Sequence, residues 1–158
     1  MFDPDAAALI EGGCSLIVGT VDADGAPLAT RGWAARIVDA GPPARVRLLI
    51  SSTDTDALAN LEATGAIAVT GADVPTLRSL QFKGTVVGIE EVTDEDRARC
   101  DRYLDSLFSD IERADGARRD VLARWIPVDY RACIIEVAER FDQTPGPGAG
   151  APIPSVTS

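Results

Sequence analysis

The sequence predicts a mainly β protein with flanking helices, arranged as a small, closed or partly closed antiparallel barrel. Six short segments have the composition of strands and are separated by turn residues, while helices are few. The first two strands are joined as a hairpin, which argues against a doubly wound sheet in which strands alternate with helices. With 158 residues, 46% of them hydrophobic, the chain can bury a proper core without disulfides or metals.

The strands follow from apolar segments bounded by glycine, proline and aspartate. Residues 22–25 (Asp-Ala-Asp-Gly) provide the tight turn of the hairpin. Gly84 and Gly88 predict bends or close backbone approaches within the longest strand. The predicted strands are residues 14–21, 27–38, 45–51, 66–70, 77–90 and 132–138.

The helices follow from capping residues and from apolar residues three and four apart. A run of Thr93 and three acids suits the positive end of a helix dipole, and a stripe from Tyr103 to Ile111 continues that helix. The stripe predicts packing against a sheet or a second subunit. The other predicted helices are residues 5–11, a segment from Thr53 or Asp54 to about Thr64, and residues 118–124.

These elements predict one domain over residues 1–141, followed by a tail over residues 142–158. Residues 145–158 hold seven prolines or glycines and too little apolar surface to fold alone. The tail is therefore expected to be either a mobile end or an arm that lies along another part of the protein.

Charge and missing residue types exclude several classes of function. Fifteen basic against 25 acidic residues give a net charge of −10, which disfavours binding to nucleic acid and to anionic membranes. The chain has no histidine, so Ser-His-Asp and Cys-His catalysis and imidazole metal sites are excluded, and we expect no metal. The acidic N-terminus does not resemble a secretion signal, and the three scattered cysteines are typical of buried small residues. We expect a cytoplasmic protein.

Three segments carry the residues suited to bind an anionic or aromatic ligand. In residues 30–36, alternation places Arg31, Trp33 and Ala35 on one strand face and Gly32, Ala34 and Arg36 on the other. Residues 51–53 (Ser-Ser-Thr) lie where a strand gives way to a helix, and the free N–H groups there suit a phosphate. The third segment puts Ser79, Gln81 and Lys83 on one polar face, a pattern that is also typical of the solvated face of a sheet.

At these segments the sequence resembles the pyridoxamine 5′-phosphate oxidase superfamily of FMN-binding split barrels. The matching order is Arg31-Gly-Trp-Ala-Ala-Arg36, a strand ending in Leu49-Ile-Ser-Ser52, a helix with Leu58-Ala-Asn-Leu61, and Leu77-Arg-Ser-Leu-Gln-Phe-Lys-Gly84. A closing segment from Phe141 to Gly150 is similar to the end of a bacterial branch. The resemblance covers nearly the whole chain and implies a six-stranded antiparallel split β-barrel. It also implies a homodimer that holds one FMN in each of two clefts between the subunits.

The resemblance also implies which residues contact the cofactor. Arg31 and Arg36 would lie near the flavin or its phosphate, and Trp125 would approach from the second subunit. The residues that the resemblance assigns to the cofactor are Arg31, Gly32, Trp33, Ala34, Arg36, Ser51, Ser52, Thr55, Ser79 and Gln81. It implies an FMN-dependent oxidoreductase of unknown substrate in which the cofactor carries the chemistry, so no catalytic residue is assigned.

Two departures from the family pattern keep alternatives open. Asp56-Ala57 stands where the family usually offers an Arg-Lys pair to the phosphate, so that Arg31, Arg36, Arg78 or Lys83 would have to compensate. The missing histidine argues against the biosynthetic oxidase and against a haem-handling relative. The alternatives are a flavin-free or flavin-storing binding or regulatory module on the same barrel dimer, or a protein that uses the deazaflavin F420.

Overall fold

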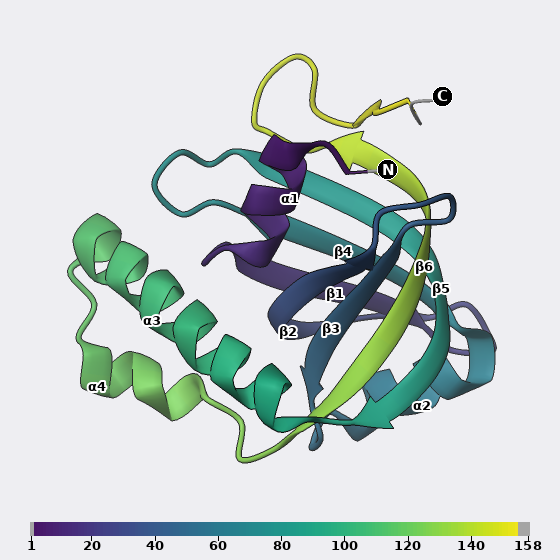
Figure 1. Ribbon diagram of the computed structural model, residues 1–158, viewed down its shortest axis with the longest axis horizontal. Helices are drawn as coiled ribbons and strands as arrows, with labels where there is room; N and C mark the ends of the chain where they lie inside the picture. Colours follow the sequence, from purple (N-terminus) through teal and green to yellow (C-terminus); the bar gives the residue numbers. More distant parts are fainter. Residues whose placement is uncertain (1, 155–158) are drawn as a thin grey trace.

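The chain forms a closed six-stranded antiparallel β-barrel with one added strand and four α-helices (Figure 1). This architecture comes from a computed structural model, which describes residues 2–154. The strand order is β3-β2-β1-β4-β5-β6-β7, and pairing of β3 with β6 closes the barrel. The strands are β1 (Ser15–Val21), β2 (Pro27–Asp39), β3 (Arg45–Ser51), β4 (Ala66–Ala72), β5 (Ser79–Glu91), β6 (Tyr130–Asp142) and β7 (Ala151–Pro152).

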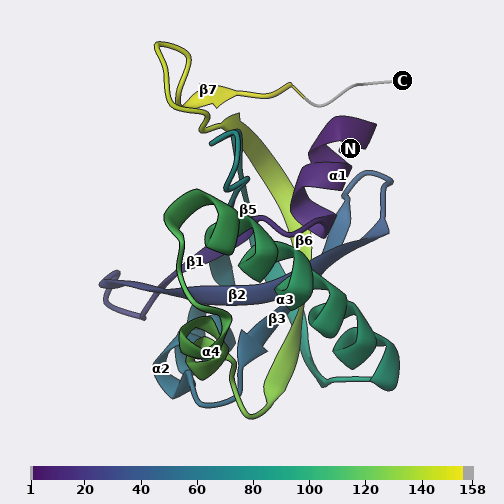
Figure 2. The same ribbon diagram turned by 90° about the vertical axis from the view of Figure 1, so that its left-hand side faces the viewer.

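The helices cover the two ends and one side of the barrel. Figures 1 and 2 show α1 and the C-terminal segment at one end, α2 at the other, and α3 running across β2. Asp3 caps α1, and Thr93 and Asp96 form the capping box that begins α3. The helices are α1 (Pro4–Glu11), α2 (Thr55–Thr64), α3 (Asp94–Asp115) and α4 (Arg119–Leu122), and a 3₁₀ turn (Ala123–Trp125) follows α4.

The barrel interior is filled by the inward-facing residues of all six strands. Phe82, Leu16, Leu48 and Val69 are among the side chains that are fully buried there. On the side of α3, Leu107 and Phe108 extend the same core, as the stripe in the sequence predicted. Because α3 uses its apolar stripe against β2 of its own chain, the barrel and the helices form one packed unit.

The predicted elements are confirmed, and the largest differences lie at the ends of the last strand and at the start of the strand predicted over 77–90. The last strand runs over 130–142, because β6 pairs with β3 along one edge and with β5 along the other. The strand predicted from residue 77 begins at Ser79, since Leu77 has a positive φ of 60° and lies in a turn. Alternation along β2 also fails at Ala34, whose φ of 72° accompanies a register shift between Gly32 and Ala35.

The described part of the tail folds back against the barrel. β7 pairs with the end of β6, and the Ile153 N–H donates to the Arg140 carbonyl at 2.8 Å. Ile153 packs against the core near the N-terminus, where Phe2 contacts Phe82 edge-on. The tail was expected to be either a mobile end or an arm along another part of the protein, and residues 151–154 form such an arm.

Candidate functional site

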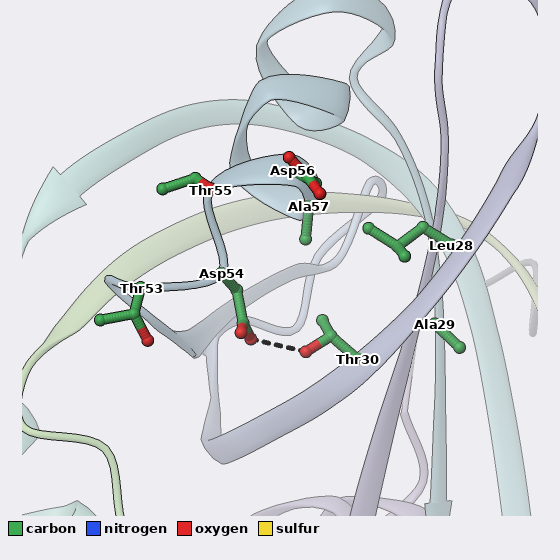
Figure 3. Close-up of a pocket in the computed structure, with 8 residues that line it drawn as sticks. All are labelled: Leu28, Ala29, Thr30, Thr53, Asp54, Thr55, Asp56 and Ala57. Carbon is green, nitrogen blue, oxygen red and sulfur yellow. Dashed lines mark hydrogen bonds between the residues drawn. The ribbon is translucent and has the colours of Figure 1, made fainter.

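Two cavities meet at Leu28 and Ala29, where β2 extends past the end of β3. One, the polar cavity, has a volume of about 220 Å³ and lies between β2 and the start of α2 (Figure 3). The other, the apolar cavity, has a volume of about 590 Å³ and lies along β1, β2, β4 and β5. Since they share two lining residues, the cavities are neighbours, one with a polar and the other with an apolar lining, and we call them the joined cavities.

The polar cavity exists because β3 ends before β2 does. β3 stops at Ser51, so residues 27–31 of β2 pair with β1 alone and present a free backbone edge. The chain then turns through residues 52–54 into α2, whose first turn faces that edge. The lining residues are Leu28, Ala29, Thr30, Thr53, Asp54, Thr55, Asp56 and Ala57.

Three of the five polar side chains that line this cavity already make hydrogen bonds. The Thr30 hydroxyl donates to Asp54 Oδ2 at 2.5 Å, an interaction that crosses the cavity in Figure 3. The hydroxyls of Thr53 and Ser51 are 2.9 Å apart and share a hydrogen bond. Asp56 is exposed and makes no ion pair within the described chain. The cavity therefore has a strongly acidic character.

The apolar cavity is kept open by small residues on the outer face of the sheet. Residues directly opposite one another in an antiparallel sheet share a face. The register Ala29–Gly19–Ala68–Lys83 forms one row across four strands. Lys83, the one lysine of the sequence, follows Ala68 in this row with its ammonium 4.7 Å from the Phe141 ring centroid, and Glu139 of β6 lies opposite it. A shallow apolar floor with one cation at its border suits a flat, mostly apolar ligand.

The neighbouring row brings together two of the residues that the resemblance assigned. Arg31, Ile17, Thr70 and Gln81 lie opposite one another on the same outer face. The Gln81 amide donates to the Thr70 hydroxyl at 3.0 Å. Ser79 lies further along β5 on that face, where its hydroxyl donates to the Leu77 carbonyl. The predicted polar face of β5 is thus present, since Leu80 and Phe82 point into the core.

Arg31 is held between two indole rings of its own chain. Its guanidinium carbon lies 5.6 Å from the ring centroid of Trp33 and 5.2 Å from that of Trp125. The Arg31 side chain makes no hydrogen bond or ion pair within residues 2–154. Trp125, which the resemblance assigned to a neighbouring subunit, therefore contacts Arg31 within the same chain.

The other assigned residues are distributed between the core and the cavity border. Gly32, Trp33 and Ala34 are buried in the monomer, with Trp33 only 4% exposed. Arg36 donates to Glu95 of α3 at 2.5 Å, so its charge is already paired. Thr55 lines the polar cavity, and Ser51 and Ser52 immediately precede its lining. Of the ten assigned residues, Thr55 alone lines the joined cavities of the described chain.

Sequence reasoning missed the contribution of residues 28–30 to the site. Their alternation is that of any strand, and the free edge depends on where the neighbouring strand ends, which a single segment does not reveal. Asp54 was interpreted as a helix cap, yet its carboxylate makes no capping hydrogen bond and reaches Thr30 instead. The cluster of threonines and aspartates over 53–56 was the one available signal.

The cysteines offer no nucleophile at this site. Burial raises the pKa of Cys14 and of Cys133 to about 12, and it also raises the pKa of Cys100. All three are buried, free thiols that stay protonated at neutral pH. Within residues 2–154, no group of three or more acidic or cysteine side chains is placed to hold a metal ion.

The family model for pyridoxamine 5′-phosphate oxidase matches residues 2–127. The chain belongs to this family. No curated protein matches it. The matched residues include the first five strands of the barrel and every residue that lines the two cavities.

Several solved structures share the fold. HupZ of Group A Streptococcus is 21% identical with a TM-score of 0.55, and the match covers 95% of this chain and 100% of that one. An F420 reductase is 18% identical with a TM-score of 0.55 over 84% and 93% of the two chains. An FMN-binding protein from Syntrophomonas wolfei is 11% identical with a TM-score of 0.54 over 96% and 85%. At these identities the likeness establishes the barrel architecture.

None of the helices in the described part of the chain combines the length and the apolar character needed to cross a membrane.

Proposed function

We propose that this protein binds a flavin in the joined cavities and acts as a flavin-dependent oxidoreductase, with FMN as the flavin that the family resemblance implies. The observation that carries the proposal is that an apolar and a polar cavity lie next to each other and share Leu28 and Ala29. A flavin has the same division, because its isoalloxazine is flat and largely apolar while its ribityl chain is polar. Membership of the pyridoxamine 5′-phosphate oxidase family supports the same ligand class.

The residues present fit such a ligand at both ends. Gly19, Ala29 and Ala68 leave the outer sheet face without protruding side chains, so a flat ring can lie on it. Lys83 borders this floor and is suited to face a carbonyl or anionic part of the ring. The hydroxyls and backbone groups at the start of α2 are suited to the polar chain. A bound flavin supplies hydride or electron transfer, while the protein orients it and shields it from water.

The proposal includes a homodimer, because the outer face is open to solvent in a single chain. Ile17 is 44% exposed and Leu28 is 37% exposed beside the apolar cavity. A second copy placed over this face would bury both and would enclose a ligand on the sheet. Trp125 and Val128, exposed by 46% and 97%, extend the apolar surface along the segment that follows α4.

We expect the substitution Ile17→Glu to weaken the dimer by at least about tenfold, since it would place an unpaired carboxylate in an apolar interface. Sedimentation equilibrium of the two proteins measures this change directly. Val38→Glu is the matched control. Val38 is similarly exposed (41%), but it lies near the last residue of β2, whereas the apolar cavity is lined by the first residues of that strand. A protein that is monomeric before substitution would refute this part of the proposal.

The flavin itself is tested by the visible absorption spectrum of the purified protein, together with mass spectrometry of what denaturation releases. We expect flavin absorbance in the purified protein or after incubation with added flavin. Quenching of flavin fluorescence then gives the affinity. A colourless chain that leaves the fluorescence of every added flavin unchanged would contradict the proposal.

One observation favours a second candidate, a flavin-free binding or regulatory module. The polar cavity holds Asp54 and Asp56, and no basic side chain lines it among the described residues. Use of F420 is disfavoured by the same carboxylates, since its longer tail is anionic.

We also propose a cytoplasmic location, because thiols stay free in a reducing compartment and the three cysteines are free and buried.

A further inference from the structure

We propose that the polar cavity selects a flavin without a terminal phosphate, so that this chain binds riboflavin more tightly than FMN. The inference rests on the proposed flavin site and concerns the end of the ligand that enters the cavity between β2 and α2. It follows from the charges and the hydrogen-bond donors that line this cavity.

The charges of the cavity oppose a phosphate. Asp54 and Asp56 contribute two carboxylates, whereas the first turn of α2 contributes the partial positive charge of a helix dipole, equivalent to about half a unit charge. No arginine or lysine among residues 2–154 lines the cavity. A phosphate dianion would therefore meet a net negative environment.

The cations that would compensate are committed elsewhere. Arg36 is paired with Glu95 of α3. Arg31 lies near the rings of Trp33 and Trp125, and it lines neither of the joined cavities. Arg78 lines a different cavity, beside α1. Lys83 borders the apolar cavity, at the end where the ring would lie. The positive charge of the joined cavities is thus placed at the ring and not at the tail of the ligand.

The donors of the cavity point to the same ligand. A phosphate dianion carries only acceptors, so it needs free donors. The Thr30 hydroxyl already donates to Asp54, and the Thr53 hydroxyl shares a hydrogen bond with Ser51. A polyol carries hydroxyls that both donate and accept, so it can donate to the two carboxylates and accept from the helix N–H groups. Ribityl hydroxyls can therefore use both the carboxylates and the donors of this lining, whereas a phosphate can use only the helix N–H groups and the Thr55 hydroxyl.

The test is a pair of fluorescence-quenching titrations of the full chain, freed of bound flavin, with riboflavin and with FMN in the presence of a chelator. We expect the dissociation constant of riboflavin to be at least about tenfold lower than that of FMN. Added salt should bring the two dissociation constants closer together, because it screens the repulsion between the phosphate and the carboxylates at this exposed site. Equal affinities, or tighter binding of FMN, would overturn the inference while leaving the proposed flavin site intact.

Asp56→Asn separates the charge effect from other causes. This variant should lower the ratio of the FMN to the riboflavin dissociation constant by at least about threefold, since it removes a charge that repels a phosphate and also weakens an acceptor for the ribityl hydroxyls. Glu62→Gln is the matched control: Glu62 is an exposed acid near the far end of the same helix and does not line the cavity. If Glu62→Gln lowered the ratio of the two dissociation constants as much as Asp56→Asn does, the inference would also be overturned. A chain that binds neither flavin would refute the proposed function itself.

Discussion

The substitution Asp96→Ala is expected to lower the free energy of unfolding by about 3–5 kcal/mol. Asp96 is 5% exposed and accepts hydrogen bonds from Arg47, itself 8% exposed, at 2.9 and 2.7 Å. Arg47 also pairs with Glu90, so this cluster ties β3, the end of β5 and the start of α3 together. Removing Asp96 leaves Arg47 buried without its main partner and breaks the capping box with Thr93.

Asp94→Ala is the control for this experiment, because Asp94 lies in the same first turn but is exposed and makes no ion pair among the described residues. Chemical denaturation should show a loss of only about 0.3–1 kcal/mol for this variant. Similar losses for both variants would mean that helix capping, and not the buried pair, accounts for the stability.

The contribution of Asp96 should also depend on pH in a defined window. Burial by itself would raise the pKa of Asp96, but hydrogen bonds from Arg47 and Thr93 outweigh it and lower the pKa to about 2. A carboxyl whose pKa is lower in the folded state stabilises the fold above its unfolded value of 3.8. That stabilisation is lost as the pH falls from about 4 towards about 2, and the difference between the wild-type chain and Asp96→Ala should shrink over that range.

The substitution Gly84→Ala is expected to cost about 3 kcal/mol of unfolding free energy. A Cβ at this position would overlap the backbone carbonyl of Glu136 in β6, and a backbone atom cannot move aside as a flexible side chain can. Gly84 lies at a register shift between β5 and β6 and also lines the apolar cavity. The strain would therefore reach both the barrel wall and the floor of the proposed flavin site.

Gly88→Ala is the matched control in the same strand. The nearest atom to a Cβ there is a flexible Ile134 side-chain carbon at 3.9 Å, an ordinary contact. We expect thermal and chemical denaturation to show a change below about 1 kcal/mol. Equal losses at the two glycines would mean that strand propensity, and not the close approach to β6, decides the effect.

Much of the fold was predictable because each element carries its own local signal. The capping run at Thr93 and the stripe ending near Ile111 predict α3 before any contact is known. Gly84 and Gly88 predict irregularities in β5, and both lie near its two register shifts. The full length of β6 was not predictable, because its last residues are stabilised by pairing with β5 and β7 and their own sequence is polar.

The site was less predictable for a physical reason. The polar cavity depends on the difference in length between β2 and β3, and such a difference appears only when the two strands are in register. The stacking of Arg31 on Trp125 joins residues that are 94 positions apart in the chain. Position in the sequence therefore identified the strands that carry the site, while the three-dimensional pairing decided which side chains line it.

Closure of the barrel by β3 and β6 has a consequence for synthesis of the chain. The residues that pair, such as Arg45 with Glu136 and Ser51 with Tyr130, are separated by half of the sequence or more. On the ribosome, the first five strands therefore emerge before the sixth is available. Until then, β3 and β5 each keep the edge that pairs with β6 unpaired. Unpaired edges of this kind associate readily with other strands, and pairings so distant form slowly. The nascent chain thus passes through an open sheet with two free edges until β6 is made.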